Sequence, residues 1–448
     1  EPWACGRARA TEPRPGSGPS FTRGRLPIVS KALESILPAR LGRDFRWLVA
    51  SSWTTNLGDG LALAAGPLLI ASATDNAGVV GLAWMLSRLP WLLFGLYAGV
   101  VADRMDRRVI MVVANTFRAG VLAVFAASIA SETVGVAAIL AALFILGVAE
   151  VFADNTASTL VPMVVETADL TTANARLTLG FVTLNQLAGP PVGAGLFAIG
   201  LWLPFASQAV IMAAGAVLIG RVVGVRGRPV QTKPAASPRH AIADGVRWLW
   251  SHSRVRTLAI LIFTFNITFG AAFSVLVVLA SERLGLDELG YGLLIGSSAV
   301  GGVLGATAYG WTERRIGVVA IMRLGLIIET ITHVVLATTT TAAVAFAILI
   351  LFGAHAAMWG TLSTSIRQGA VPLDYQGRVS SVYQLGLQGG LVIGAGVGAA
   401  VAAAFGVTAV YWFAFVGSAL ILAGIWRRIS NIAVLGGEDQ RVGEGERP

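Results

Sequence analysis

Long apolar runs separated by short charged segments are the most regular feature of the chain. Twelve such runs of about 20 residues occur between residues 47 and 426, and an α-helix needs about 20 apolar residues to cross a hydrocarbon layer about 30 Å thick. Each run predicts one membrane-spanning helix, so we expect an all-α membrane protein with twelve transmembrane helices. The predicted spans are 47–72, 79–102, 109–130, 134–153, 172–198, 201–223, 258–280, 289–309, 316–337, 342–363, 379–404 and 407–426.

The composition agrees with this pattern. Of the 448 residues, 55% are hydrophobic and 13% charged, and the mean hydropathy is +0.73. These values exclude a set of ordinary soluble domains. Cys5 is the single cysteine, so an intramolecular disulfide cannot form.

The basic residues gather on one side of the predicted membrane. The net charge is +9, and 29 of the 33 Lys and Arg residues share one side if both termini are cytoplasmic. Cytoplasmic loops carry an excess of Lys and Arg, so we expect cytoplasmic termini in an inner or plasma membrane. This distribution accounts for the charge without a nucleic-acid partner. The four Lys and Arg residues that are not on this side are Arg283, on the outer side, and Arg88, Arg118 and Arg323, within spans.

A polar, proline-containing connection divides the spans six and six. A Val-Pro pair, Val161-Pro162 or Val371-Pro372, precedes a glycine-rich span in each half. Two pseudo-symmetric halves are typical of secondary transporters, in which the substrate binds between the halves near the midplane. The predicted parts are a mostly disordered cytoplasmic tail, an N-terminal half, a central loop, a C-terminal half and a second cytoplasmic tail, at 1–46, 47–223, 224–256, 257–428 and 429–448.

The connection after the second span reads Gly99-Val-Val-Ala-Asp103-Arg104-Met-Asp106-Arg107-Arg108. It resembles the G-x-x-x-D-R-x-x-R-R signature of the major facilitator superfamily (MFS), and it stands where that signature stands. The resemblance covers nearly the whole chain from 47 to 426 and implies the MFS fold. Many members have Gly in place of Asp106, so we expect a tighter or differently capped turn here.

This motif is also a candidate conformational latch. Gly99 permits close helix approach, and we expect Asp103 to pair with Arg378 at the start of the eleventh span, in one state only. Glu150 and Asp154 share a helix face and either join this charge network or are solvated at the helix end. The arginines of the motif have a simpler interpretation as topology determinants and anionic-lipid contacts; they are Arg104, Arg107 and Arg108.

The fifth span carries Asn185-Gln-Leu-Ala-Gly189-Pro190-Pro191-Val-Gly193-Ala194-Gly195. It resembles the antiporter motif of MFS exporters, built around G-P-x-x-G, at Gly189, Pro190 and Gly193. Asn185 and Ala194 depart from that motif. Prolines kink a helix and glycines allow tight packing, so generic helix packing is an equal interpretation.

Asp59 is the candidate coupling residue. It lies 13 residues beyond Arg46, about 20 Å into the bilayer at 1.5 Å per residue, where a carboxylate is costly unless it is paired or faces water. Two interpretations stand: a proton-coupling or cation-binding acid, or a structural residue paired with Arg118. Glu329 and His333 share a helix face, and we favour a structural role for them over a second relay.

Polar and aromatic residues of several spans are candidates to line a central substrate cavity. His355 lies deep in the tenth span as a candidate ligand-binding or packing residue, and the few histidines make a metal site improbable. The candidates are Asn56, Asn185, Gln186, Asn266, Phe269, Phe273, His355, Trp359, Gln384 and Gln388.

The sequence contains no phosphate-binding loop, nucleophile elbow or metal-ligand cluster, so we expect no enzyme, no cofactor, and energy from an ion gradient. The elements Asn56-Leu-Gly-Asp59, Ala173-Asn174-Ala175 and Gly377-Arg378-Val379 look like the exporter branch that includes macrolide efflux and enterobactin exporters. That similarity implies proton-coupled export, and our leading hypothesis is antiport of amphiphilic small molecules such as drugs or siderophores, with sodium as an alternative ion. One chain contains both halves, so we expect a functional monomer. The alternatives are a nutrient or lipid uptake transporter and a non-transporting receptor or scaffold.

Overall fold

The computed structural model describes residues 39–223 and 238–429, and every regular element in these two ranges is a helix. Residues 1–38 and 430–448 of the predicted tails and residues 224–237 of the predicted central loop lie outside the described residues, whereas residues 39–46 of the first predicted tail are helical. The elements are η1 (Ala39–Leu41), α2 (Gly42–Ala73), α3 (Ala77–Arg104), α4 (Arg107–Ala130), α5 (Val136–Val164), η2 (Thr167–Asp169), α6 (Leu170–Gly180), η3 (Phe181–Ala188), α7 (Gly189–Ile199), α8 (Leu203–Ile219), α9 (Pro238–Ser251), α10 (Ser253–Ser274), α11 (Leu276–Glu282), α12 (Glu288–Thr338), α13 (Ala342–Ala370), α14 (Leu373–Phe405) and α15 (Val407–Ile425).

Nine of the helices in the described ranges are long and apolar enough to cross a bilayer. The fifth predicted span is divided into α6, the π-helical segment η3 and α7, which begins at the Gly189-Pro190-Pro191 sequence. The eighth and ninth predicted spans are merged in α12, where Gly317 has a non-helical, left-handed backbone (φ 76°). Glycine adopts this conformation without the steric penalty of a side chain.

Helix α9 was not predicted, because its charged residues made the region read as a polar loop. One of its faces is apolar, and Leu249 is buried in a small cluster with Val255, Val371 and Val379. A carbon added at Gly245 would lie 2.7 Å from the carbonyl oxygen of Arg378. The close contact packs α9 against the first turns of α14.

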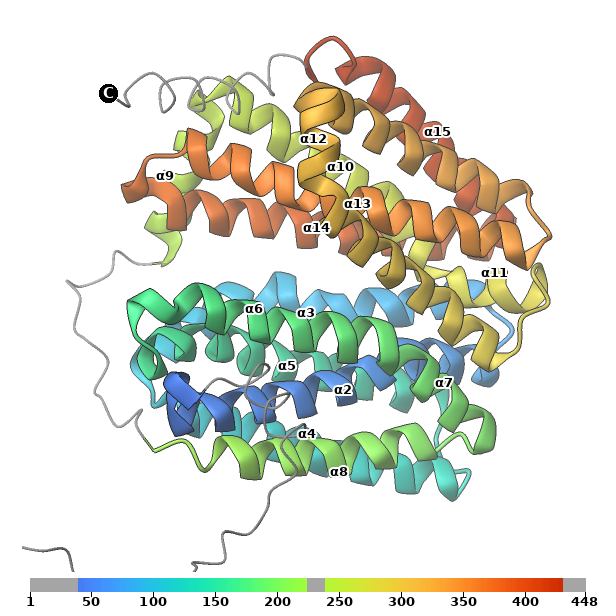
Figure 1. Cartoon of the computed structure of the whole chain (residues 1–448). Coiled ribbons are helices and arrows are strands. Elements are labelled where there is room, and N and C mark those ends of the chain that lie inside the picture. Colours follow the sequence, from blue (N-terminus) through green and yellow to red (C-terminus); the bar gives the residue numbers. More distant parts are fainter. Residues whose placement is uncertain (1–38, 224–237, 430–448) are drawn as a thin grey trace, which may run out of the picture. The chain divides into compact units, whose positions relative to one another are not determined.

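The helices form two groups within the compact unit that begins at Leu41. Figure 1 shows α2 to α8 gathered in one group and α10 to α15 in the other. The groups meet where α3 contacts α14 and where α7 contacts α12. Helices of both groups therefore border the space between them.

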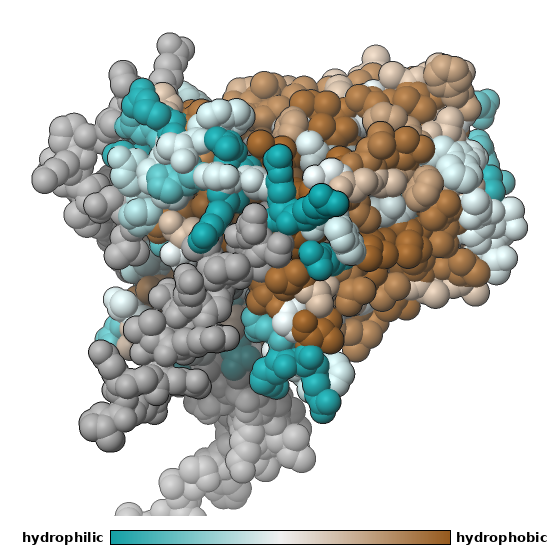
Figure 2. Space-filling view, turned by 90° about the horizontal axis from the view of Figure 1, so that it is seen from above, coloured by the Kyte–Doolittle hydropathy of each residue, from teal (hydrophilic) through white to brown (hydrophobic). Residues whose placement is uncertain are grey.

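The exterior of the described part is strongly apolar. Large side chains such as Val124, Val210 and Leu420 are 70%, 71% and 69% exposed. Figure 2 shows a broad apolar band on one face, with hydrophilic residues towards its ends. Soluble monomers rarely expose apolar patches of this extent, so the band is the surface that lipid covers in a multi-pass membrane protein.

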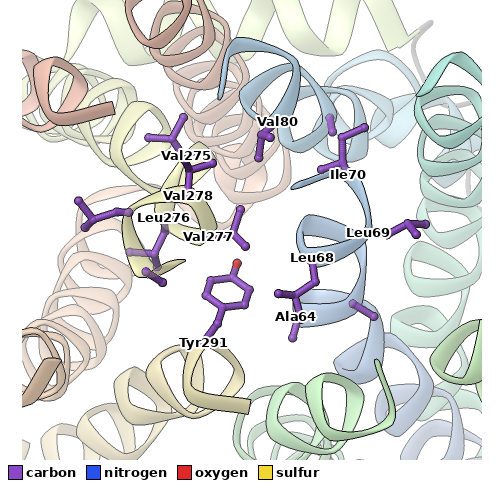
Figure 3. Packing of buried hydrophobic residues seen from close by; sticks show 14 of the residues in the cluster. Ala64, Leu68, Leu69, Ile70, Val80, Val275, Leu276, Val277, Val278 and Tyr291 are labelled. Carbon is purple, nitrogen blue, oxygen red and sulfur yellow. The ribbon is translucent and has the colours of Figure 1, made fainter. Parts of the chain in front are cut away.

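At one end the two groups are closed against each other by a hydrophobic cluster. Figure 3 shows Leu68 of α2, Val277 of α11 and Tyr291 of α12 directed towards one another, with Ile70 and Val80 beside them. Their exposed fractions lie between 0% and 8%. Water is excluded where these side chains interdigitate, so this end of the space between the groups is sealed.

Candidate transport cavity

A cavity of about 2,050 Å³ lies between the two groups. Asn56 and Asp59 line it from α2, and Gln384 and Gln388 line it from α14. Towards the hydrophobic cluster it ends near Ile70. In the other direction its lining reaches helix ends with exposed residues, among them Arg104, Ser158 and Gly377. The cavity is therefore closed at one end and wide at the other.

Five of the predicted cavity residues line this space: Asn56, Asn185, Gln186, Gln384 and Gln388. Their helices α2, η3 and α14 come from both groups. The amide side chains bring hydrogen-bond donors and acceptors to a wall that is otherwise largely apolar. Asn56 uses its own amide nitrogen locally, donating to the Ser52 carbonyl oxygen at 2.7 Å.

The other predicted cavity residues do not line the cavity in this structure. Phe269 stacks on Phe352 with ring centroids 5.4 Å apart and also contacts Phe273. Asn266 lies in the α10–α14 interface, where its amide nitrogen donates to the Ile262 carbonyl oxygen at 2.7 Å. The sequence identified helices that reach the cavity. Successive residues of a helix point in directions about 100° apart, so the sequence did not show which of them face the cavity.

His355 and Trp359 are also packed away from the cavity, inside the C-terminal group. The His355 ring makes an edge contact with Phe352 at 5.2 Å, and Trp359 belongs to a second hydrophobic cluster. Glu329 and His333 are buried on α12 and likewise do not line the cavity. In the described residues no group of three His, Cys, Asp or Glu side chains is placed to hold a metal ion.

The centre of the cavity wall carries a buried ion pair between Asp59 on α2 and Arg118 on α4. The Arg118 Nη2 donates to Asp59 Oδ1, and the two side chains are 3% and 13% exposed. Both residues line the cavity. The pairing of Asp59 with Arg118, one of the two interpretations that the sequence allows, is present here, and the carboxylate remains accessible from the cavity side.

Glu150 and Asp154 of α5 face the same cavity. Neither forms a hydrogen bond or ion pair within the described part of the chain, although Glu150 interacts electrostatically with Asp59, Arg118 and Arg88. Arg88 lines the cavity beside the ring of Trp84, 5.4 Å from its centroid. Arg88 was not among the predicted site residues, although a charged residue within a membrane span is itself a signal of a functional site.

The glycines of the predicted antiporter motif pack directly against the turn of α2 that carries Asp59. A carbon added at Gly189 would lie 2.4 Å from the Gly60 Cα, and one added at Gly193 would lie 2.3 Å from the Leu61 carbonyl oxygen. On the other side, a carbon added at Gly292 of α12 would lie 2.7 Å from the Pro190 carbonyl oxygen. The motif helix is therefore held between α2 and α12, one from each group.

The predicted latch is only partly described. The side chain of Asp103 lies outside the described part, so its pairing with Arg378 stays a prediction. Arg378 Nη1 lies 3.5 Å from Asp244 Oδ2 of α9. This partner was not predicted, because the sequence of α9 resembles a polar loop. Gly99 faces the cavity, and a carbon added there would meet nothing within 4 Å. The expected close helix approach therefore does not occur at Gly99.

The remaining residues of the motif fix α4. Asp106 is its N-cap and accepts hydrogen bonds from the backbone amides of Arg108 and Val109 at 2.9 and 3.4 Å, which confirms the expected change in capping. The Arg108 Nη2 donates to the Gly220 carbonyl oxygen beyond α8. Arg107 donates to Thr159 Oγ1 at 2.9 Å, whereas Arg104 lies exposed at the cavity rim.

Solved structures of several transporters share this fold. A nucleoside transporter, NupG, matches with a TM-score of 0.68 and 13% identity over 86% of this chain and 99% of that one. A bacterial homologue of the iron transporter ferroportin, in its inward-facing state, matches with a TM-score of 0.71 and 16% identity over 87% and 99%. A bacterial homologue of the human lysosomal transporter Spinster matches with a TM-score of 0.67 and 13% identity over 92% and 98%.

Sequence comparison is more specific. The multidrug efflux pump Tap of Mycolicibacterium fortuitum is 26% identical over 279 residues, which are 60% of this chain and 66% of that pump. The match thus spans just under two thirds of the relative. The family model of transmembrane secretion effectors matches residues 37–441. The chain therefore belongs to the transmembrane secretion effector family of the major facilitator superfamily, whose members are transporters and not enzymes.

Proposed function

We propose that this protein is a proton-coupled antiporter that exports amphiphilic small molecules by alternating access. The observation that carries this proposal is the cavity between the two groups, with a buried Asp59–Arg118 pair and two further carboxyl groups on its wall. The similarity to the pump Tap supports drug efflux as the direction and substrate class. A lipid-covered multi-pass chain that hosts such a cavity has the parts a secondary transporter needs.

The proposal includes twelve spans and cytoplasmic termini. The helices supply twelve if α12 is counted as two spans around Gly317, α6 to α7 as one, and α10 with α11 as one. Six spans then lie in each of two pseudo-symmetric halves. The positive-inside rule places the Arg-rich helix ends, including those at Arg104 and Arg378, on the cytoplasmic side of an inner or plasma membrane.

With that orientation, the wide end of the cavity faces the cytoplasm and the hydrophobic cluster around Tyr291 closes the outer side. The structure is then in an inward-facing state. The bacterial ferroportin homologue supports this assignment, because its inward-facing structure matches with a TM-score of 0.71 and its outward-facing structures with 0.57 and 0.58. An exporter loads its substrate from the cytoplasm or the inner leaflet in this state.

The cavity favours large amphiphilic substrates. Its volume of about 2,050 Å³ exceeds the roughly 300–1,000 Å³ of a drug-sized binding site. Trp84 and Trp91 of α3 offer aromatic surface, while Gln384 and Gln388 of α14 offer amide groups. A wide cavity with few fixed polar groups accepts related molecules of different shape. One chain supplies both walls, so we propose that the monomer is functional.

Coupling follows from competition for the carboxyl groups of the cavity. A substrate cation or amine and a proton would compete for Asp59, Glu150 and Asp154, so that one leaves when the other binds. Protonation of Asp59 would weaken its attraction to Arg118 and thereby change the contact between α2 and α4. In the outward-facing state Arg378 would leave Asp244 and pair with Asp103, closing the cytoplasmic side.

The test uses inside-out vesicles loaded with acid. Candidate macrolides, tetracyclines, cationic dyes and siderophores are added, and proton release is measured for the wild type, Asp59→Asn and the control Asp75→Asn. Asp75 is an exposed residue outside the helices, so its loss should change nothing. We expect substrate-induced proton release in the wild type and the control only.

Three outcomes decide between the alternatives. Release that persists in Asp59→Asn removes Asp59 from coupling. Substrate flux without proton release indicates transport that is not coupled to protons. Substrate flux that responds to sodium indicates that sodium is the coupling ion. Accumulation in right-side-out vesicles indicates an uptake transporter, and no flux of any compound in either orientation supports a receptor or scaffold. Loss of transport in Asp103→Ala at unchanged membrane abundance would support the latch, and normal transport would reject it.

A further inference from the structure

A second, smaller hollow lies between α10 and α15, apart from the transport cavity. Its volume is about 420 Å³, and none of its lining residues lines the larger cavity. One end is lined by Arg254, Arg256 and Arg428. The rest is lined mainly by apolar and hydroxyl side chains, including Ile260 and Ile421. The groove is therefore basic at one end and apolar along its length.

The basic end holds more positive charge than the described residues neutralise. Arg254 and Arg256 lie in the first turn of α10, which contains no acidic residue and receives no side-chain cap from His252. A helix N-terminus carries partial positive charge and is stabilised by anions, whereas arginines there are unfavourable. An arrangement of this kind gains stability when an anion occupies it.

The three guanidinium groups lack acidic partners in the described part of the chain. Arg256 donates to the Trp250 carbonyl oxygen at 2.6 Å and lies 5.9 Å from the centroid of its ring. The side chains of Arg254 and Arg428 form no hydrogen bond or ion pair with a described residue, and both are exposed. Their donors are free to bind an external phosphate, which arginine recognises in bidentate geometry.

The apolar length of the groove lies on the surface that lipid covers. Ile260 is 46% exposed, and a carbon added at Gly424 would meet nothing within 4 Å. Trp250, whose carbonyl oxygen accepts a hydrogen bond from Arg256 of the basic end, is 59% exposed, as expected for an indole ring at the level of lipid headgroups. A free phosphate would use only the arginines, whereas a ligand with a phosphate and an acyl chain matches both parts.

We propose that this groove binds one anionic phospholipid. Its phosphate lies on Arg254, Arg256 and Arg428, and one acyl chain lies along α10 and α15 over Ile421 and Gly424. The lipid joins the first transmembrane helix of the C-terminal group to the last. This site does not depend on the transported substrate, so it stands or falls separately from the export activity.

The experiment measures lipid retention by native mass spectrometry of the full chain. The purified protein is exposed to phosphatidylglycerol or to phosphatidylcholine with the same acyl chains. The variants are Arg254→Gln with Arg428→Gln, Gly424→Leu, and the control Arg314→Gln with Arg315→Gln. The control removes two exposed arginines, one of them beside Trp311, outside the groove. Millimolar inorganic phosphate forms a separate arm, read by thermal stability.

We expect preferential retention of phosphatidylglycerol by the wild type and the control. Removing two arginines at the membrane surface should weaken that retention roughly 30-fold. Gly424→Leu fills the apolar part and should reduce retention without a change in charge. Equal retention of both lipids, or equal losses in the groove and control pairs, overturns the proposal. Stabilisation by inorganic phosphate alone, or full retention in Gly424→Leu, overturns it in favour of an anion site without an acyl groove.

Discussion

Replacement of Gly193 by alanine should separate α7 from α2 and destabilise the protein. The added methyl carbon would lie 2.3, 2.7 and 2.9 Å from the carbonyl oxygen, Cα and carbonyl carbon of Leu61. All three are backbone atoms, so no side-chain rotation relieves the clash. The helices must move apart by about 1 Å to restore an ordinary contact distance.

The expected loss of stability follows from two opposing terms. Overpacking of a close-packed interface costs about 1–3 kcal/mol, and a clash with backbone belongs at the upper end. Alanine is favoured over glycine in a helix interior by about 1 kcal/mol. The net loss should be about 2 kcal/mol. With an unfolding entropy of about 2.1 cal/mol/K per residue, a chain of 448 residues should then melt about 2 °C lower.

Gly195 provides the matched control on the same helix. A carbon added there meets only the Leu289 Cδ1, at an ordinary 3.9 Å, so Gly195→Ala should leave stability unchanged or raise it by up to about 1 kcal/mol. The assay is thermal unfolding of the purified variants in one detergent, followed by size-exclusion chromatography. Equal melting temperatures for Gly193→Ala and Gly195→Ala would refute the close contact between α7 and α2.

Two further predictions concern the cavity. Asp59→Asn and Arg118→Gln should each destabilise the protein by about 3–5 kcal/mol, because each leaves one buried charge without its partner. In the same unfolding assay, the double variant should lose less stability than the sum of the two single losses. Additive losses would contradict the pairing. In a Cys5→Ser background, Gln388→Cys should react with a water-soluble thiol reagent, whereas Ala64→Cys, which is fully buried, should not. Labelling of both positions, or of neither, would show that the cavity is not hollowed as described.

The spans were predictable from sequence because bilayer thickness fixes helix length and leaves a signal about 20 residues long. Charged residues in the bilayer were equally visible, and the pairing of Asp59 with Arg118 was one of the two interpretations that the sequence allowed. Which face of a helix meets the cavity was not predictable. Asn185 and Asn266 are both amides in transmembrane helices, yet only Asn185 lines the cavity.

Helix α9 and its contacts were missed for a different reason. Its apolar face is short, and the charged residues beside it resemble a solvated loop when read along the chain. The partner that Asp244 offers to Arg378 depends on that helix being packed against α14. A tertiary contact of this kind has no local signal, so the sequence favoured Asp103 as the partner instead.

The π-helical segment η3 lets the fifth span hold one residue more than a regular α-helix of the same length. A π turn closes with i→i+5 hydrogen bonds, so it takes up an extra residue without changing the direction of the residues that follow. Loss of one residue between Phe181 and Ala188 would therefore restore a regular α-helix and leave Gly193 against Leu61. Loss of Val192, in the regular α-helix α7, would instead turn Gly193 away from Leu61 by about 100°. A single-codon deletion should therefore be tolerated better within η3 than at Val192.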